Sequence, residues 1–117
     1  MNDTDIRPVY IRLIDEIYMR ILTAEYPSGS KIPAVRDLAL TLQANPNTVQ
    51  RALNYIEERG LIYTQRTTGK YVTEDQSLID GARRGLAEKY AAEYFDKMSR
   101  IGYDKAGAIS FISDGEG

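Results

Sequence analysis

Residues 44–53 read ANPNTVQRAL and gather short amide and hydroxyl side chains at the start of a predicted helix. The polar members that follow the proline are Asn47, Thr48, Gln50 and Arg51. Asn and Gln amides can bond adenine through two hydrogen bonds, and an arginine can bond N7 and O6 of guanine. The free N–H groups and the dipole of a helix N-terminus attract phosphate. These residue types therefore suit nucleic-acid binding, although an ordinary helix cap followed by a solvated face has the same composition.

The helix that carries these side chains has a clear beginning and end in the sequence. Asn45 is a good N-cap because its carbonyl can accept a backbone N–H of the first turn, and Pro46 has the φ of a first helical position. Arg59 and Gly60 are typical of a helix C-terminus. The apolar stripe comprises Val49, Ala52, Leu53 and Ile56. The opposite face carries Asn47, Gln50, Arg51 and Asn54, with Thr48 at its edge.

Two further helices are predicted before this one. A long helix begins near Pro8 and ends before the turn-forming residues 26–30, and a shorter one follows Pro33. The long apolar stripe comprises Tyr10, Leu13, Ile14, Ile17, Tyr18, Ile21 and Leu22. The short stripe comprises Val35, Leu38, Ala39 and Leu42. Residues 43–45 leave only a tight connection to the third helix, which is the helix-turn-helix arrangement.

A β-hairpin is predicted directly after the third helix. Residues 61–65 and 70–73 are rich in β-branched and aromatic side chains, and residues 66–69 between them suit a turn. Three helices followed by a hairpin form a winged helix-turn-helix, in which the third helix enters the major groove of DNA with its N-terminal residues at the base edges. The order of elements therefore favours the nucleic-acid interpretation of residues 44–53.

The remainder of the chain is predicted to be helical. Apolar residues recur at spacings of three and four from Ser77 to about Tyr103, with Gly81 and Gly85 inside the pattern, so the segment is either two helices or one with a bend. Residues 106–112 are candidates for a short last helix. The expected fold is mainly α with a small β-hairpin wing: a winged domain over residues 1–74 and an α-helical region over residues 75–117.

Composition narrows the function classes. The 117 residues include no cysteine and no histidine, which removes disulfides, the usual zinc sites, and Ser-His or Cys-His catalytic pairs. We expect no cofactor. No apolar run is long enough for a membrane span, and the N-terminus does not resemble a signal peptide, so we expect a cytoplasmic protein.

The net charge is −2, but residues 1–73 carry +1 and residues 74–117 carry −3. A DNA-binding face must therefore come from local clustering of cations.

Other polar residues lie where they could flank a DNA-binding helix. Arg36 falls on the first turn of the second helix, just after Ser30 and Lys31, where contacts to the DNA backbone are plausible. Residues 66–70 place two cations around small residues at the hairpin tip, which could enter or flank a minor groove. A solvated surface is the alternative for each. The complete predicted DNA-binding set is Ser30, Lys31, Arg36, Asn45, Asn47, Thr48, Gln50, Arg51, Arg66, Thr68, Gly69 and Lys70.

The C-terminal stripe is too wide to be buried against one small winged domain, so we predict that it packs on its copy in a second subunit. The predicted dimerisation residues are Leu86, Tyr90, Tyr94, Met98 and Ile101. An aromatic ligand cage built from the tyrosines is a weaker alternative, because these residues follow the helical stripe.

Four segments resemble GntR-type bacterial transcriptional regulators. They read GSKIPAVRDLA (29–39), NPNTVQRAL (45–53), ERGLIYTQR (58–66) and GKYV (69–72). The NPNTVQRA motif together with a short tail resembles the YtrA-type branch. The resemblance implies a homodimer that binds an inverted-repeat operator in double-stranded DNA, usually as a repressor, often of a transporter operon. Any small-molecule effector is of unknown identity, and we expect it to bind at the junction of the tail and the winged domain.

The resemblance assigns roles to particular residues. Arg36 corresponds to the DNA-contacting arginine of the second helix, and Gly69 falls on the wing tip. The recognition helix carries Asn47, Thr48, Gln50 and Arg51. Two positions depart from the family: Ala34 replaces a helix-capping serine, and residues 66–69 replace a wing that often reads Arg-Gly-Lys-Gly.

Two other function classes are compatible with the sequence. A winged helix can dock a protein partner without touching DNA, and the acidic tail and negative net charge favour this slightly. A small enzyme using carboxylates and tyrosines is the other class. The lack of histidine, cysteine and a glycine-rich phosphate loop counts against it.

Overall fold

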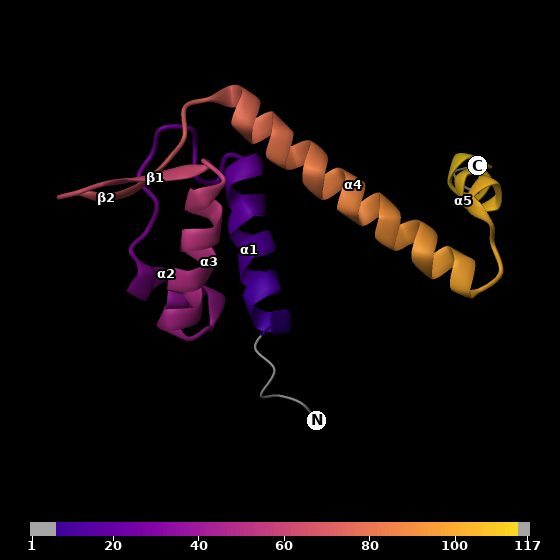
Figure 1. Ribbon diagram of the computed structural model, residues 1–117, viewed down its shortest axis with the longest axis horizontal. Helices are drawn as coiled ribbons and strands as arrows, with labels where there is room; N and C mark the ends of the chain where they lie inside the picture. Colours follow the sequence, from indigo (N-terminus) through magenta and orange to yellow (C-terminus); the bar gives the residue numbers. More distant parts are fainter. Residues whose placement is uncertain (1–6, 115–117) are drawn as a thin grey trace. The chain divides into compact units, whose positions relative to one another are not determined.

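The computed structural model describes residues 7–114 of the chain. Its elements in chain order are α1 (Arg7–Leu22), α2 (Val35–Leu42), α3 (Pro46–Glu58), β1 (Ile62–Gln65), β2 (Gly69–Val72), α4 (Gln76–Arg100) and α5 (Lys105–Asp114), as labelled in Figure 1. The chain forms two compact units that divide after Ala82, within α4. The predicted functional division after residue 74 stays a prediction.

One apolar core holds the first unit together. α3 lies between α1 and α2 and contacts both, and it also contacts β1 (Figure 1). Leu13 and Ile17 of α1 and Leu53 and Ile56 of α3 are completely buried. Side chains of this size each stabilise the fold by about 1.5–3 kcal/mol when fully buried. The helical stripes predicted from the sequence are therefore the faces that pack together, and their packing fixes the rotation of α3 about its axis.

The connection between α2 and α3 is a tight turn. Gln43 adopts a left-handed conformation with φ of 53°, and its backbone N–H bonds carbonyls of the last turn of α2. The N–H of Ala44 also donates to the carbonyl of Ala39 at 3.0 Å. These hydrogen bonds end α2 with a left-handed C-cap. The next helix, α3, begins at Pro46. The predicted helix-turn-helix is confirmed.

The wing is a two-stranded antiparallel hairpin in which Ile62 pairs with Val72. The segment before α2 runs along its edge, which the residue pattern did not predict. The N–H of Gly29 donates to the carbonyl of Val72, and the N–H of Val72 donates to the carbonyl of Ser30, both at 2.9 Å. The N–H of Ile32 donates to the carbonyl of Lys70, also at 2.9 Å. The base of the wing is therefore tied to the residues that lead into α2.

The second unit contains most of α4, from Arg83 onwards, and all of α5. α4 continues through Gly81 and Gly85 as one helix, which decides between the two predicted alternatives, and it ends shortly before Gly102, where φ is +103°. The short last helix predicted over residues 106–112 is present as α5. The Tyr94 hydroxyl on α4 donates a hydrogen bond to the carbonyl of Ala108 on α5 at 2.7 Å. The expected class, mainly α with a hairpin wing and a helical tail, is confirmed.

Across residues 7–114, none of the helices combines the length and the apolar character that a membrane crossing needs.

Candidate nucleic-acid interface

The outward face of α3 carries the polar residues that the sequence pattern indicated. Val49 and Ala52 are completely buried, so the opposite side of the helix is turned to solvent. Asn47 and Arg51 are exposed, whereas Thr48 and Gln50 are partly covered. A row of hydrogen-bonding groups therefore remains on α3 after the core has formed.

Asn45 has a structural role at the start of this helix. Its side-chain oxygen accepts a hydrogen bond from the N–H of Asn47 at 2.7 Å, and its backbone carbonyl accepts from Thr48 and Val49 at 3.0 Å. This is the predicted N-cap, with Pro46 at the first turn. Because its side-chain oxygen accepts within the cap, Asn45 serves to begin α3, and its amide nitrogen faces solvent at the exposed N-terminus.

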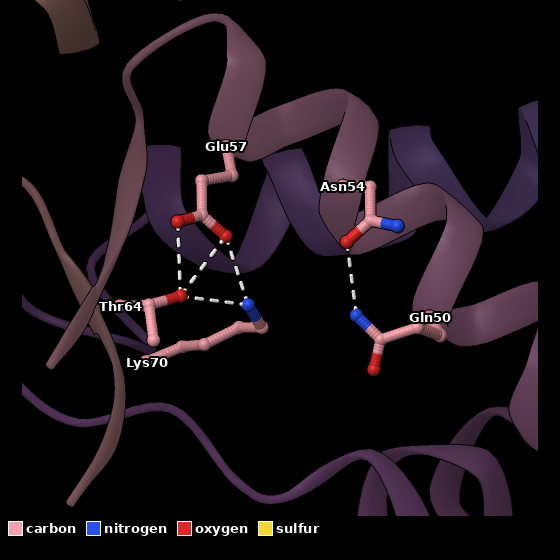
Figure 2. Close-up of polar contacts among 5 residues, drawn as sticks. All are labelled: Gln50, Asn54, Glu57, Thr64 and Lys70. Carbon is pink, nitrogen blue, oxygen red and sulfur yellow. Dashed lines mark hydrogen bonds and ion pairs between the residues drawn. The ribbon is translucent and has the colours of Figure 1, made fainter. Parts of the chain in front are cut away.

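Two side chains on the exposed face of α3 have a defined orientation. The Gln50 amide nitrogen donates to Asn54 Oδ1 at 2.9 Å, one helical turn further on (Figure 2). The Arg51 guanidinium lies 5.3 Å from the centre of the Tyr10 ring of α1, a cation–π distance. Neither Asn54 nor Tyr10 was in the predicted DNA-binding set. The spacing of four between Gln50 and Asn54 could have indicated their pairing, but nothing local indicates Tyr10.

The start of α2 is a second place where an anion could bind. Ala34 occupies the N-cap position in an extended conformation and provides no side-chain hydrogen bond. Arg36 is exposed and makes no side-chain hydrogen bond or ion pair with the described part of the chain. An uncapped helix N-terminus with a free guanidinium beside it suits a phosphate group.

A pocket of about 230 Å³ joins the start of α2 to the wing. Its lining includes Lys31, Ala34 and Val35 on one side and Thr68, Gly69 and Lys70 on the other. Lys31 is exposed. Gly69 has a φ of +127°, and a side chain added there would place its Cβ 2.9 Å from Cε of Lys31. The backbone conformation therefore favours glycine at this point of the wing, and any side chain here would also displace the end of Lys31. Ser30, by contrast, uses its hydroxyl to donate to the carbonyl of Pro27 at 2.6 Å.

The two predicted wing cations have different surroundings. Arg66 is exposed at the hairpin turn, next to the exposed Thr68. Lys70 forms an ion pair with Glu57 of α3 at 2.8 Å and also donates to the Thr64 hydroxyl at 2.8 Å (Figure 2). Glu57, a partner that sequence spacing did not indicate, therefore neutralises much of the charge that Lys70 could offer to a phosphate.

The pKa of Glu57 reflects this cluster. Partial burial raises the pKa, but hydrogen bonds from Lys70 and Thr64 outweigh burial and hold it below the ordinary value. Glu57 is therefore ionised at neutral pH and holds the Lys70 ammonium.

The predicted dimerisation residues are distributed unevenly between surface and interior. Leu86 is buried within the chain itself, and Tyr94 and Met98 are partly buried. Tyr90 and Ile101 are exposed, the latter with 70% of its surface accessible. Three apolar side chains of α5 outside the predicted set are also exposed: Ile109, Phe111 and Ile112.

Similarity to known proteins identifies the family. The family model for bacterial regulatory proteins of the gntR family matches residues 9–72. A GntR family transcriptional regulator from Listeria monocytogenes is 37% identical, with a TM-score of 0.80 over 93% of this chain and 96% of that one. The HTH-type transcriptional repressor YtrA of Bacillus subtilis is 34% identical over 84 residues, which cover 70% of this chain and 65% of the repressor.

A more distant likeness extends to a DNA-bound structure. The AraR DNA-binding domain, solved in complex with operator ORR3, is 23% identical, with a TM-score of 0.52 over 55% of this chain and 77% of that one. At this level of identity the likeness concerns the fold alone. The family model covers more than half of the chain, and the similarity to YtrA confirms the resemblance to that branch. The chain therefore belongs to the gntR family of bacterial regulatory proteins, as a transcriptional regulator and not an enzyme.

Proposed function

We propose that this regulator acts as a homodimer that binds an inverted-repeat operator in double-stranded DNA and represses transcription. The observation that carries the proposal is the outward face of α3. On this face Asn47, Gln50 and Arg51 lie outside the buried stripe. They occupy the first turns of the helix, directly after its N-cap. In a helix-turn-helix such side chains bond base edges in the major groove.

The surroundings of α3 support contacts to the DNA backbone. Arg36 at the start of α2, Lys31 in the segment that leads into α2 and Arg66 at the hairpin turn are exposed cations. Cations that neutralise phosphates supply most of the sequence-independent part of DNA affinity. These cations fall within residues 1–73, which carry +1, so DNA binding is compatible with the net charge of −2. The wing and Lys70 complete the proposed contact set, and the protein would act in the cytoplasm with the DNA.

A dimer is supported by the apolar surface of the C-terminal helices. Tyr90 on α4, Ile101 in the turn after α4, and Ile109, Phe111 and Ile112 on α5 are exposed. A second subunit that covers them would bury this surface and present a second recognition helix. Two-fold symmetric proteins of this kind bind half-sites about one turn of DNA, roughly 34–36 Å, apart.

The proposal is tested by selecting bound duplexes from a random DNA pool with the full chain at near-physiological salt, followed by sequencing. An enriched inverted repeat is the expected result. The Arg84→Ala variant provides a matched control, because Arg84 pairs with Glu88 on the exposed surface of α4, outside the proposed DNA-binding elements. It should enrich the same repeat.

No enrichment by a correctly folded dimer, with and without added cell metabolites, would contradict the proposal and favour a winged helix that docks a protein. Repression itself is tested with a reporter gene placed behind the selected repeat.

A further inference from the structure

Gln50 and Asn54 form a side-chain pair on the exposed face of α3, and we propose that Asn54 is a positioning residue for base recognition. It fixes the orientation of the Gln50 amide so that Gln50 selects adenine at one position of the half-site. This inference rests on the proposed function, because it concerns how α3 reads an operator. Asn54 itself acts through Gln50 and does not need to touch DNA.

The geometry of the pair is simple. Gln50 Nε2 donates a hydrogen bond to Asn54 Oδ1 at 2.9 Å, between residues one turn apart (Figure 2). Asn54 is exposed, as are Asn47 and Arg51 on the same side of the helix. The positions 47, 50, 51 and 54 follow the i, i+3, i+4, i+7 spacing of one helical stripe. Asn54 therefore belongs to the same outward face as the predicted base-reading residues.

A glutamine by itself discriminates poorly between bases. Its amide carries an acceptor oxygen and a donor nitrogen on one carbon, and half a rotation about the last bond exchanges them. A free Gln50 could therefore turn its nitrogen towards the acceptors of guanine, which weakens its preference for adenine. Discrimination requires a contact that makes one of the two orientations unfavourable.

Asn54 favours one orientation through the bond it makes in this structure, and because its own amide can also turn, Asn54→Asp, which can only accept, is the variant that holds the order fixed. The Asn54 oxygen accepts from Gln50 Nε2, so the Gln50 oxygen is turned away from Asn54 and remains available. Nε2 carries a second hydrogen that is also available. The fixed amide thus offers an acceptor and a donor in a set order, which matches the N6 amino group and N7 of adenine. With guanine, the Gln50 oxygen would face the O6 acceptor, and only one of the two hydrogen bonds could form.

The test measures base preference with the full chain on its selected operator. Duplexes with each of the four base pairs at every half-site position are compared by equilibrium binding. The position whose preference disappears in Gln50→Ala is the position that Gln50 reads. Wild-type protein should prefer adenine there over guanine by about tenfold or more, as expected for a good two-bond contact.

Two variants of Asn54 then test its role. Asn54→Ala removes the acceptor, so the preference at that position should fall to about threefold or less while other positions keep theirs. Asn54→Asp can only accept, so it should retain the adenine preference even though its added charge weakens binding to all duplexes. Asp80→Ala is a matched control, because it removes the acceptor of a similar bond, Gln76 Nε2 to Asp80 Oδ1 at 3.1 Å, on α4.

The outcomes are distinguishable. An unchanged adenine preference in Asn54→Ala would overturn the inference, and so would a guanine preference in Asn54→Asp or in the wild type. If the wild-type chain shows no sequence preference at any position, the proposed function fails first and the inference fails with it. Thermal unfolding of each variant, monitored by circular dichroism, establishes that the exposed substitution leaves the fold intact.

Discussion

Lys70 Nζ donates a hydrogen bond to Glu57 Oε1 at 2.8 Å, which joins the wing to the last turn of the recognition helix. The Thr64 hydroxyl completes a closed cluster, because it donates to Glu57 Oε2 at 2.9 Å and accepts from Lys70 at 2.8 Å (Figure 2). The side chains of Lys70 and Glu57 are 19% and 33% exposed, so the pair is screened by water less than a fully solvated one. The cluster fixes both strands of the wing to α3.

The first prediction concerns the pH dependence of stability. The pKa of Glu57 is lowered in the folded chain, so its contribution to the free energy of unfolding is present above the ordinary pKa of 4.5 and disappears as pH falls through the folded-state pKa. Glu57→Gln should therefore destabilise the protein at pH 6, and the difference from wild type should shrink towards pH 3. Urea denaturation at the two pH values measures this. Glu58→Gln, at a more exposed neighbouring residue, should show a smaller pH-dependent difference.

The second prediction concerns base reading by Arg51. Arg51→Ala should reduce discrimination at one base pair by about 1–3 kcal/mol if the guanidinium makes two hydrogen bonds to guanine. Arg51→Lys retains the charge but not the planar fork, so it should lose the preference while keeping most of the salt dependence. Binding titrations on operators with each base at that position provide the measurement. Full discrimination in both variants would remove Arg51 from the base-reading set.

The third prediction concerns backbone contact by Arg36. Arg36→Ala should weaken binding to all duplexes alike and reduce the slope of log affinity against log salt by about 0.9 for each phosphate that is no longer neutralised. Arg36→Lys should restore most of the slope because it keeps the charge. Titrations between about 50 and 200 mM salt cover the useful range. A change confined to one operator sequence would indicate a base contact in place of a phosphate contact.

The fourth prediction concerns the missing cap of α2. Ala34 already has the extended backbone conformation of an N-cap residue, with φ of −65° and ψ of 157°. Ala34→Ser should therefore add a side-chain hydrogen bond to the first turn and raise the free energy of unfolding by about 1 kcal/mol. Chemical denaturation measures the increase. Ala87→Ser, in the interior of α4, should give no increase, since serine is a weaker helix former than alanine.

The fifth prediction concerns the subunit interface. Ile101→Glu places a charge on a highly exposed apolar residue of the helical tail. If this surface packs on a second subunit, association would bury the added charge, which is energetically costly. The variant should therefore sediment as a monomer and bind the operator with greatly reduced affinity. Leu40→Glu, at a residue of α2 that is 74% exposed, is the control for the same change outside the tail. An Ile101→Glu variant that remains dimeric would place the interface elsewhere.

The features that could be predicted from the residue pattern are those that depend on local interactions. The spacing of Leu13, Ile14 and Ile17 predicted the buried side of α1, and Asn45 with Pro46 predicted where α3 begins. These features depend on contacts within one or two turns, which a residue pattern expresses directly. The polar face of α3 followed from the same periodicity, because the positions left over after the core stripe must face solvent.

The meeting of distant side chains, by contrast, is a property of the folded chain. Lys70 and Glu57 are thirteen positions apart on different elements, and Arg51 reaches Tyr10 only because α1 and α3 pack at a particular angle and rotation. Lys70 was predicted from the sequence to contact DNA from the wing, and the structure shows it paired with the carboxylate of Glu57. Likewise, helical spacing placed Leu86 on an apolar stripe but could not show that it is buried within its own chain. Such contacts depend on the relative placement of whole elements, and local patterns do not encode that placement.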